Sequence, residues 1–230
     1  GGDHVIFSLQ KFVRLALDGN PNIIETLFTR AEDQLFVHPL AQELLQRRAM
    51  FLSQKVGFKF GRYAIHQLQK IERHHRWLTT DPPNAPKPED FGAVPGENSP
   101  KFPDTASEKA FRAAVKHHRA YKAWRKNRNP KRAALEEKYG YDTKHAMHLC
   151  RLLKMGCEIL EEGEVHVFRP DAAWLRRVRE GALSYRDLLD WVKEMEQRLA
   201  DSERRSELPA EPSFHDAEQM VVRITEAYLR

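Results

Sequence analysis

The chain has little cysteine and no long hydrophobic run. Its 230 residues include only two cysteines, Cys150 and Cys157. They lie seven positions apart in a segment of helical periodicity, which would separate them by about 10 Å along a helix axis, too far for a disulfide. We therefore expect two reduced thiols in the core of a cytoplasmic protein. No apolar stretch reaches the roughly 20 residues that cross a bilayer, so we expect no membrane partner.

Several motifs that carry chemistry are also missing. The sequence has no glycine-rich phosphate loop of the Rossmann or Walker type and no cysteine pair with zinc-finger spacing. It has no nucleophile elbow and no metalloprotease helix motif. These absences exclude the sequence signatures of the commonest nucleotide, zinc and hydrolase sites. A site in this chain has to be found from side-chain patterns instead.

The chain does contain enough apolar residues for a core, together with an excess of positive charge. Hydrophobic residues make up 41% and charged residues 31%, which is typical of a folded soluble chain. The formal net charge is +5, and 11 histidines would add to it at mildly acidic pH. This excess favours an anionic partner without identifying it, because many basic proteins bind no nucleic acid.

Hydrophobic periodicity and capping residues predict a mainly α-helical bundle with one or two short strands. One helix is expected to begin at Asn20-Pro21; the others cover about residues 8–19, 39–54, 60–78, 107–126, 130–140, 143–161, 170–180, 184–205 and 214–229. Short strands are expected at residues 3–7 and 164–168. A proline-rich break at 79–105 separates a helical region, 1–78, from a C-terminal helical region, 106–230.

The segment at residues 144–160 carries two patterns at once. Apolar residues at helical spacing give it a buried face. Lys144, His148, Arg151 and Lys154 follow one another at offsets of four, three and three, so they form one cationic stripe along the helix. Such a stripe on a buried helix suits a polyanion, for example a triphosphate or an RNA backbone. The alternative is a face that is merely solvated.

Two other polar features are open to two interpretations. His145 and His148 are three residues apart and could share a metal ion, but the spacing offers no third ligand. Glu25 lies among apolar residues on the helix that follows Asn20-Pro21. A carboxylate there is either a half-buried group with a structural partner or a functional one, and we favour the structural role.

Three stretches of sequence, in this order, resemble a known family. The first contains SLQKF (residues 8–12), LALDGNPN (15–22) and ETLF (25–28), and the second is FKFGRYAIHQL (58–68). The third is residues 144–160, followed by GEV (163–165) and RPD (169–171). Together they resemble the predicted nucleotidyltransferases of the DNA polymerase beta superfamily, in the group associated with RNA repair. The match covers most of the chain outside the proline-rich break.

The resemblance implies transfer of a nucleoside monophosphate from a nucleoside triphosphate to a nucleic-acid end, above all RNA. In that superfamily a Gly-Ser turn and an Asp-x-Asp pair hold two Mg²⁺ (or Mn²⁺) ions. This chain contains neither motif. The resemblance would place both ahead of residue 1, so we expect either part of a longer enzyme, following its catalytic palm, or a helical region whose palm has been lost. In neither case should the chain catalyse the transfer alone. Only Asp3 could match the superfamily's third carboxylate, as a catalytic and metal-binding residue.

The resemblance also assigns binding roles to two sets of residues. The nucleotide would be bound by Lys11, Asn20, Tyr63, Gln67, Lys144, His145, His148, Arg151 and Lys154. The basic helix at 107–126 would bind the nucleic-acid acceptor through Arg119, Lys122, Trp124, Arg125 and Lys126, with Tyr121 and Trp124 available for base stacking. Two alternatives stay open: a non-catalytic helical module that binds nucleic acid or a protein, and a toxin–antitoxin or phage-defence component.

Overall fold

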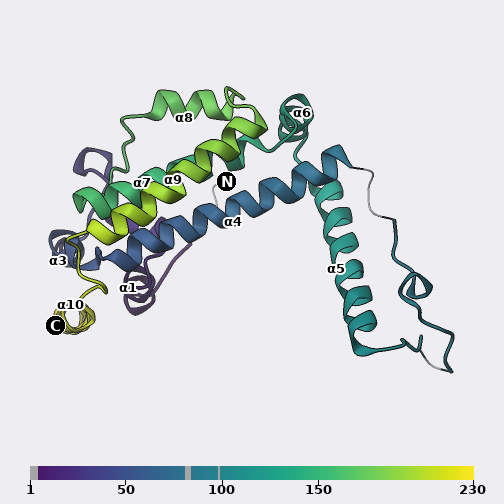
Figure 1. Ribbon diagram of the computed structural model, residues 1–230. Helices are drawn as coiled ribbons and strands as arrows, with labels where there is room; N and C mark the ends of the chain where they lie inside the picture. The colour runs from purple at the N-terminus through teal and green to yellow at the C-terminus, as the bar shows by residue number, and fades with distance from the viewer. Residues whose placement is uncertain (1–4, 81–83, 98) are drawn as a thin grey trace. The chain divides into compact units, whose positions relative to one another are not determined.

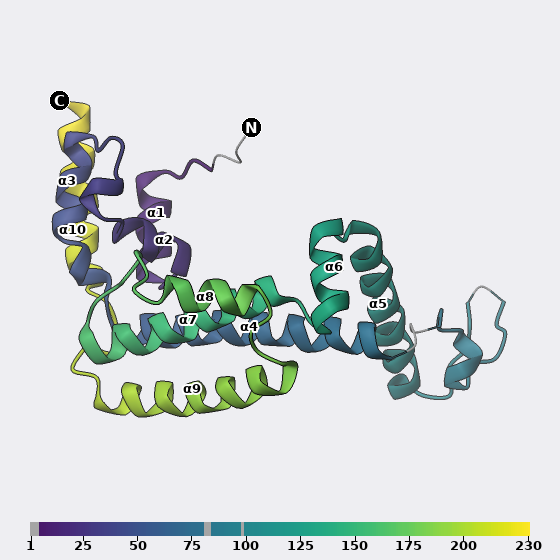
Figure 2. The same cartoon turned by 90° about the horizontal axis from the view of Figure 1, so that it is seen from above.

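The chain folds almost entirely into helices, as Figures 1 and 2 show. The computed structural model describes residues 5–80, 84–97 and 99–230, and within them it contains ten α-helices and no β-strand. The α-helices are α1 (Leu9–Leu17), α2 (Pro21–Leu27), α3 (Pro39–Gln46), α4 (Gln54–Thr79), α5 (Thr105–Asn127), α6 (Pro130–Tyr139), α7 (Thr143–Glu162), α8 (Ala172–Arg179), α9 (Tyr185–Arg205) and α10 (Phe214–Leu229). Short 3₁₀ helices are η1 (Ala31–Asp33), η2 (Arg48–Phe51) and η3 (Pro88–Phe91). The predicted mainly α-helical fold is confirmed.

The chain divides into two compact units, and the division falls within α4. Unit 1 comprises the residues up to Lys70 together with Thr143–Arg230, and unit 2 comprises Ile71–Asp142. This grouping differs from the linear regions 1–78, 79–105 and 106–230 expected from the sequence. The reason is that the last helix returns to the first ones, since α10 packs against both α1 and α3.

Local capping residues fix the two short helices at the start of unit 1. The Ser8 hydroxyl accepts a hydrogen bond from the backbone N–H of Lys11, and the Asn20 side chain accepts one from the N–H of Asn22. Between the two helices Gly19 adopts a φ of 69°, a left-handed conformation that glycine tolerates best. These caps confirm the predicted helix ends and fix the position of Glu25 on α2.

The helix expected at residues 39–54 is wrong. The chain forms α3, then the 3₁₀ helix η2, and α4 begins at Gln54, six residues before the predicted start. At this break the backbone bonds to the C-terminal segment instead: the N–H of Gln54 donates to the Pro209 carbonyl at 2.9 Å, and the N–H of Ser213 donates to the Met50 carbonyl at 3.2 Å. Phe51, Leu52 and Ser53 are buried there, at 0%, 3% and 0% exposed.

Neither predicted strand forms within the described residues. Residues 5–7 and 164–168 have no strand partner, and residues 3 and 4 lie outside the described part of the chain. At 164–168 the backbone turns instead, with the N–H of Val167 bonded to the carbonyl of Val165 at 3.2 Å. The described residues contain one isolated bridge, between Val94 and Lys101. A short β-prone segment forms no strand when nothing lies alongside it.

Helix α7 is the centre of unit 1. Its apolar face is almost completely buried, and α8 and α9 both pack against it. Two glycines allow a close approach to α4: a Cβ on Gly57 would lie 2.4 Å from the side chain of Leu160, and one on Gly156 would lie 3.2 Å from the Gly57 carbonyl. Cys150 and Cys157 are buried and free, and burial raises the pKa of these thiols to about 12 and about 11.

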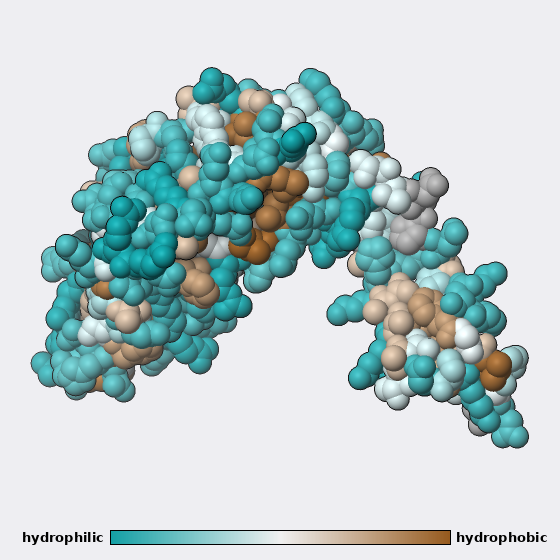
Figure 3. Space-filling model, viewed as in Figure 1, coloured by the Kyte–Doolittle hydropathy of each residue, from teal (hydrophilic) through white to brown (hydrophobic). Residues whose placement is uncertain are grey.

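A groove of about 410 Å³ runs between α4 and α9. Its apolar lining includes Phe58, Ile65 and Leu199. Figure 3 shows a hydrophobic patch between these two helices on an otherwise mostly hydrophilic face of unit 1. None of the residues predicted to bind nucleotide is among those that line this groove. The candidate site therefore lies elsewhere in unit 1.

Unit 2 has an aromatic core of its own. The Trp77 ring contacts those of Tyr121, Trp124 and His117, with centroid distances of 5.2–5.6 Å. The indole N–H of Trp77 also donates a hydrogen bond to His117 Nε2 at 3.2 Å. These contacts hold α5 against the last turns of α4.

Candidate functional site

The four cationic residues predicted to form one stripe on α7 have different environments. Lys144 is exposed and His148 is half-buried. Arg151 Nη1 lies 2.7 Å from Glu25 Oε2, and this carboxylate is only 14% exposed. Glu25 therefore has the structural partner that the sequence left open, and Arg151 is already paired within unit 1.

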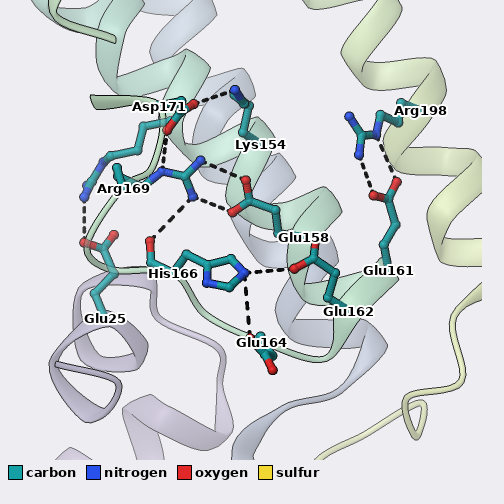
Figure 4. Close-up of polar contacts among 11 residues, drawn as sticks. Glu25, Lys154, Glu158, Glu161, Glu162, Glu164, His166, Arg169, Asp171 and Arg198 are labelled. Carbon is teal, nitrogen blue, oxygen red and sulfur yellow. Dashed lines mark hydrogen bonds and ion pairs between the residues drawn. The ribbon is translucent and has the colours of Figure 1, made fainter. Parts of the chain in front are cut away.

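The other end of the stripe belongs to a charge network, drawn in Figure 4. Lys154 Nζ lies 2.5 Å from Asp171 Oδ2. The Arg169 guanidinium donates to both carboxylate oxygens of Glu158 and, at 2.9 Å, to Asp171 Oδ1. Burial alone would lower the pKa of Arg169 and raise that of Asp171, but their mutual bonds outweigh it and shift both pKa values the other way. Lys154 is thus held by an ion pair in this network, and its role at the nucleotide stays a prediction.

His148 reports a positive electrostatic potential at the other half of the stripe. Its pKa is lowered to about 4, first by burial and then by the charges of Arg151, His145, Lys144 and Lys70. The imidazole is therefore neutral at pH 7, and its Nδ1 lies 3.4 Å from Arg151 Nη2, as an acceptor of that N–H. We call Lys70, Lys144, His145, His148 and Arg151 the cationic cluster. Such a group of charges on a half-buried surface is suited to an anion.

Helices α2 and α4 border the cationic cluster with further polar groups. The Asn20 amide donates to the Tyr63 hydroxyl at 3.5 Å. One turn along α4, Gln67 is 9% exposed, and its Oε1 has no hydrogen-bond partner among the described residues. Lys70 follows on the same helical face, and the described part of the chain offers it no ion pair. Tyr63, Gln67 and Lys70 thus extend the stripe of polar groups along α4.

Two contacts join the three stretches of sequence that carry the family resemblance. Asn20 to Tyr63 links the first stretch to the second, and Glu25 to Arg151 links the first to the third. Segments up to 126 residues apart therefore meet at one site. The arrangement can hold a multiply charged anion. Its one carboxylate, on Glu25, is already engaged by an arginine.

Some predicted residues lie apart from this site. Lys11 is exposed on α1, with its ammonium 5.1 Å from the centre of the Phe7 ring. Asp3 lies outside the described residues, so its catalytic and metal-binding roles stay predictions. His145 acts on His148 through its charge, and no third ligand joins these two histidines among the described residues. The metal site considered for this pair is therefore not formed.

The basic helix α5 presents its charges outward. Four of the residues predicted to bind nucleic acid are exposed: Arg119, Lys122, Arg125 and Lys126. Trp124 instead packs inward, 5.2 Å from Trp77 and 5.9 Å from Tyr121 between ring centroids, and Arg128 covers it at 4.6 Å. Tyr121 is only 8% exposed. The aromatic core of unit 2 thus already engages these two rings, and their stacking on bases stays a prediction.

The charges of α5 nevertheless form a long polar face. The helix carries seven lysine or arginine residues and a single acidic residue, Glu108, which pairs with Arg112 at 2.5 Å. Exposed cations at Lys109, Lys116, Arg119 and Lys126 lie on one side of it and span about 25 Å at 1.5 Å per residue. This length matches several consecutive phosphates of a nucleic acid.

Two groups of side chains in the described part of the chain could hold a metal ion. One is Glu162, Glu164 and His166; the other is His74, Glu136 and Asp142. The Mg²⁺ implied by the resemblance fits neither the cationic cluster, where protein groups would repel it, nor a group containing a histidine, because Mg²⁺ prefers oxygen ligands. Mg²⁺ could enter the cationic cluster only as a complex with a triphosphate.

The sequence missed some residues of the site for two different reasons. Lys70 follows Gln67 by three positions, so its helical spacing could have revealed it. Asp171 and Glu158 gave no such signal, because an ion pair between different segments depends on the tertiary fold.

Comparison of the chain with protein-family models, with curated proteins and with solved structures finds no match. In the part of the chain that the structure describes, every helix is too short or too polar to span a bilayer.

Proposed function

We propose that unit 1 binds the triphosphate of a nucleotide at the cationic cluster, as the helical part of a nucleotidyltransferase of the DNA polymerase beta superfamily. One observation carries the proposal. The three stretches that resemble this family, separated by up to 126 residues, meet where burial and neighbouring cations lower the pKa of His148 to about 4. A half-buried surface with that potential favours a ligand of high negative charge.

Each member of the cluster has a distinct role in this proposal. Lys70 and Lys144 offer ammonium groups to the phosphate oxygens. The ion pair with Glu25 holds the Arg151 guanidinium in one orientation, so it is already positioned before the ligand binds. The neutral imidazole of His148 accepts from Arg151 at Nδ1 and presents an Nε2–H donor.

The Mg²⁺ or Mn²⁺ that the resemblance implies would supply charge neutralisation of the phosphates and activation of the attacking hydroxyl. The cluster itself offers it no ligand set, as described above. In this proposal the residues of the chain bind and orient the triphosphate, and the metal-binding carboxylates lie outside the cluster. The described residues are thus responsible for affinity, and transfer needs further groups.

The exposed cations of α5 are the proposed contact for the nucleic acid that accepts the nucleotide, RNA above all. Phosphate contacts from Arg119, Lys122, Arg125 and Lys126 would give affinity without sequence preference. The same observation also favours the second candidate function, a non-catalytic module that binds nucleic acid. The two differ in whether unit 1 binds a nucleotide.

Nucleotide binding is tested by titrating the chain with ATP and MgCl₂ in a calorimeter. Lys70→Ala and Lys144→Ala should each weaken binding about tenfold, the usual effect of losing a charge-assisted hydrogen bond. The control is Lys193→Ala, which removes an exposed lysine of α9 outside the cluster. Equal affinity in all three variants, or no binding by the parent chain, would refute the proposal.

RNA binding is tested through its salt dependence. A variant carrying Arg119→Ala and Lys122→Ala should lower the slope of log K against log salt by about 1.4 on single strands, or 0.7 for each lost phosphate contact. ATP affinity should not change. RNA binding without any nucleotide binding would instead establish the second candidate function. Transfer of labelled nucleotide to RNA is then tested with the longest chain that contains these residues.

A further inference from the structure

The C-terminal end of α7 brings together three potential metal ligands. His166 Nε2 lies 2.8 Å from Glu162 Oε2 and 3.8 Å from Glu164 Oε2. Figure 4 shows the imidazole reaching back towards both carboxylates. The three ligand atoms all lie within 4.8 Å of one another. An ion with four ligands at 2.0–2.1 Å separates those ligands by about 3.3–3.4 Å, so the observed spacing is close to that of a coordination shell.

The backbone holds these ligands in place from both sides. Gly163 ends α7 with a φ of 67° and bonds its N–H to the Ile159 carbonyl, which reverses the chain after Glu162. Val165 is buried, 8% exposed, between the two later ligands. The Arg169 side chain donates to the His166 carbonyl at 3.5 Å. The ligand set is therefore preorganised and loses little conformational entropy when an ion binds.

The charges at this end of the helix favour a cation. The last turn of α7 contains no basic residue, and the negative end of the helix dipole lies there. Neighbouring acids are neutralised: Arg169 binds Glu158 and Arg198 binds Glu161. For Glu162 and Glu164, by contrast, the described chain provides no lysine or arginine, and His166 is the group that both of them contact.

In the second group of potential ligands, His74, Glu136 and Asp142, arginines already neutralise both carboxylates. In unit 2, Arg128 pairs with Glu136 at 2.9 Å and Arg132 pairs with Asp142. Two guanidinium groups thus neutralise the two carboxylates next to His74. A divalent ion there would have to displace both arginines from a buried site, which costs far more than filling an exposed one. This contrast favours the end of α7.

We propose that Glu162, Glu164 and His166 bind one Zn²⁺ ion, separate from any Mg²⁺ of nucleotide chemistry. One imidazole nitrogen with two carboxylate oxygens is a ligand set that Zn²⁺ accepts and Mg²⁺ does not favour. The ligands are 35–69% exposed, so at least one coordination position stays open to water. Glu162 also lines a cavity of about 750 Å³.

The test is calorimetric titration of the full chain with ZnCl₂ at neutral pH, without nucleotide. His166→Ala and Glu164→Gln should each weaken Zn²⁺ binding about tenfold or more, because each removes one of three ligands. The matched controls are His215→Ala and Glu194→Gln, which change exposed residues of α10 and α9. Circular dichroism shows whether each variant keeps its helices.

A second readout identifies the ligands directly. Co²⁺ in place of Zn²⁺ should give visible ligand-field absorption with the parent chain, and this band should be lost in His166→Ala. The proposal is overturned if His166→Ala binds Zn²⁺ as tightly as the parent chain, or if His74→Ala loses the ion instead. Since the assay contains no nucleotide, neither outcome depends on the proposed function.

Discussion

The protonation of His148 is a direct measure of the cationic cluster. An ordinary histidine has a pKa of 6.5, and the folded chain lowers that of His148 to about 4, through burial first and neighbouring cations second. At pH 6 the imidazole should be about 1% protonated, against about 75% for an unperturbed histidine. The experiment is therefore a pH titration of the free chain, followed by a second pH titration with an anion present.

The shift also predicts a pH dependence of stability. Between pH 6.5 and pH 4 the unfolded chain binds a proton at His148 that the folded chain does not. The contribution of this group to stability is thus complete above pH 6.5 and is lost as the pH falls towards 4. The fall of the His148 pKa from 6.5 to about 4 corresponds to at most about 3 kcal/mol of folding stability, and solvent screening of the half-buried ring reduces this value. His148→Gln should remove this part of the slope.

Binding of an anion should reverse the shift. A triphosphate at the cluster would offset the charges of Lys70, Lys144 and Arg151, so the pKa of His148 should rise by about one unit or more. The assay is a proton NMR titration of the imidazole signals with and without inorganic triphosphate. His148→Gln assigns the signal, and His215, exposed on α10, is the control whose signal should not move when triphosphate is added.

Two results would contradict this reasoning. If His148 titrates near 6.5 in the free chain, the cations listed above do not act on it and the cluster has no strong potential. If its pKa is low but triphosphate leaves it unchanged, the potential exists and the anion binds elsewhere. The first result removes the electrostatic premise, and the second removes the proposed location.

Three substitutions test other parts of the structure. Gly57→Ala places a Cβ within 3.0 Å of three atoms of the buried Leu160, so urea denaturation should show a loss of about 1–3 kcal/mol; an unchanged midpoint would contradict the close helix contact. Arg151→Met leaves the half-buried Glu25 without its ion-pair partner and should lower the free energy of unfolding by about 2–4 kcal/mol. Adding Glu25→Gln in a double variant should restore part of this loss, and additive losses would argue against the ion pair. Lys144→Gln removes one charge of the cationic cluster, so triphosphate affinity should fall; unchanged affinity would contradict its role there.

The helix ends could be predicted from the sequence because they depend on a few adjacent residues. Ser184 accepts from the Asp187 N–H, and Asp187 accepts from the Ser184 N–H, a capping box that the local sequence encodes. At the start of α6 the Asn129 side chain accepts from the N–H groups of Lys131 and Arg132, and Gly140 ends the helix with a φ of 78°. Such features need no knowledge of the rest of the chain.

The sequence was least informative where tertiary packing decided the outcome. The break between α3 and α4 depends on backbone hydrogen bonds to residues 209–213, which local spacing does not reveal. Trp124 was expected to meet a ligand, and the fold packs it into the aromatic core of unit 2. A sequence shows that a side chain can stack or pack, and only the fold shows which partner it finds.

For the candidate site, the sequence predicted the cations and not their partners. The helical spacing of Lys144, His148 and Arg151 was sufficient to place them on one face. The neutralisation of Arg151 by Glu25, 126 residues earlier, could not be derived from any local pattern. Local spacing therefore identifies the cationic stripe, whereas the ion pair that orients Arg151 depends on the tertiary fold.

The charges of α7 run against its own dipole at both ends. Its first turn carries Lys144 and no acidic residue. Its last turn has no basic residue; Glu161 there is paired with Arg198, and Glu162 has no lysine or arginine partner among the described residues. Negative groups at the start and positive groups at the end would be the stabilising order, so the free helix bears an electrostatic cost at each end. An anion bound near His148 and a cation bound at His166 would each remove one of these costs. The two proposed ligands are therefore opposite in charge for the same physical reason, and each should raise the melting temperature of the chain independently of the other.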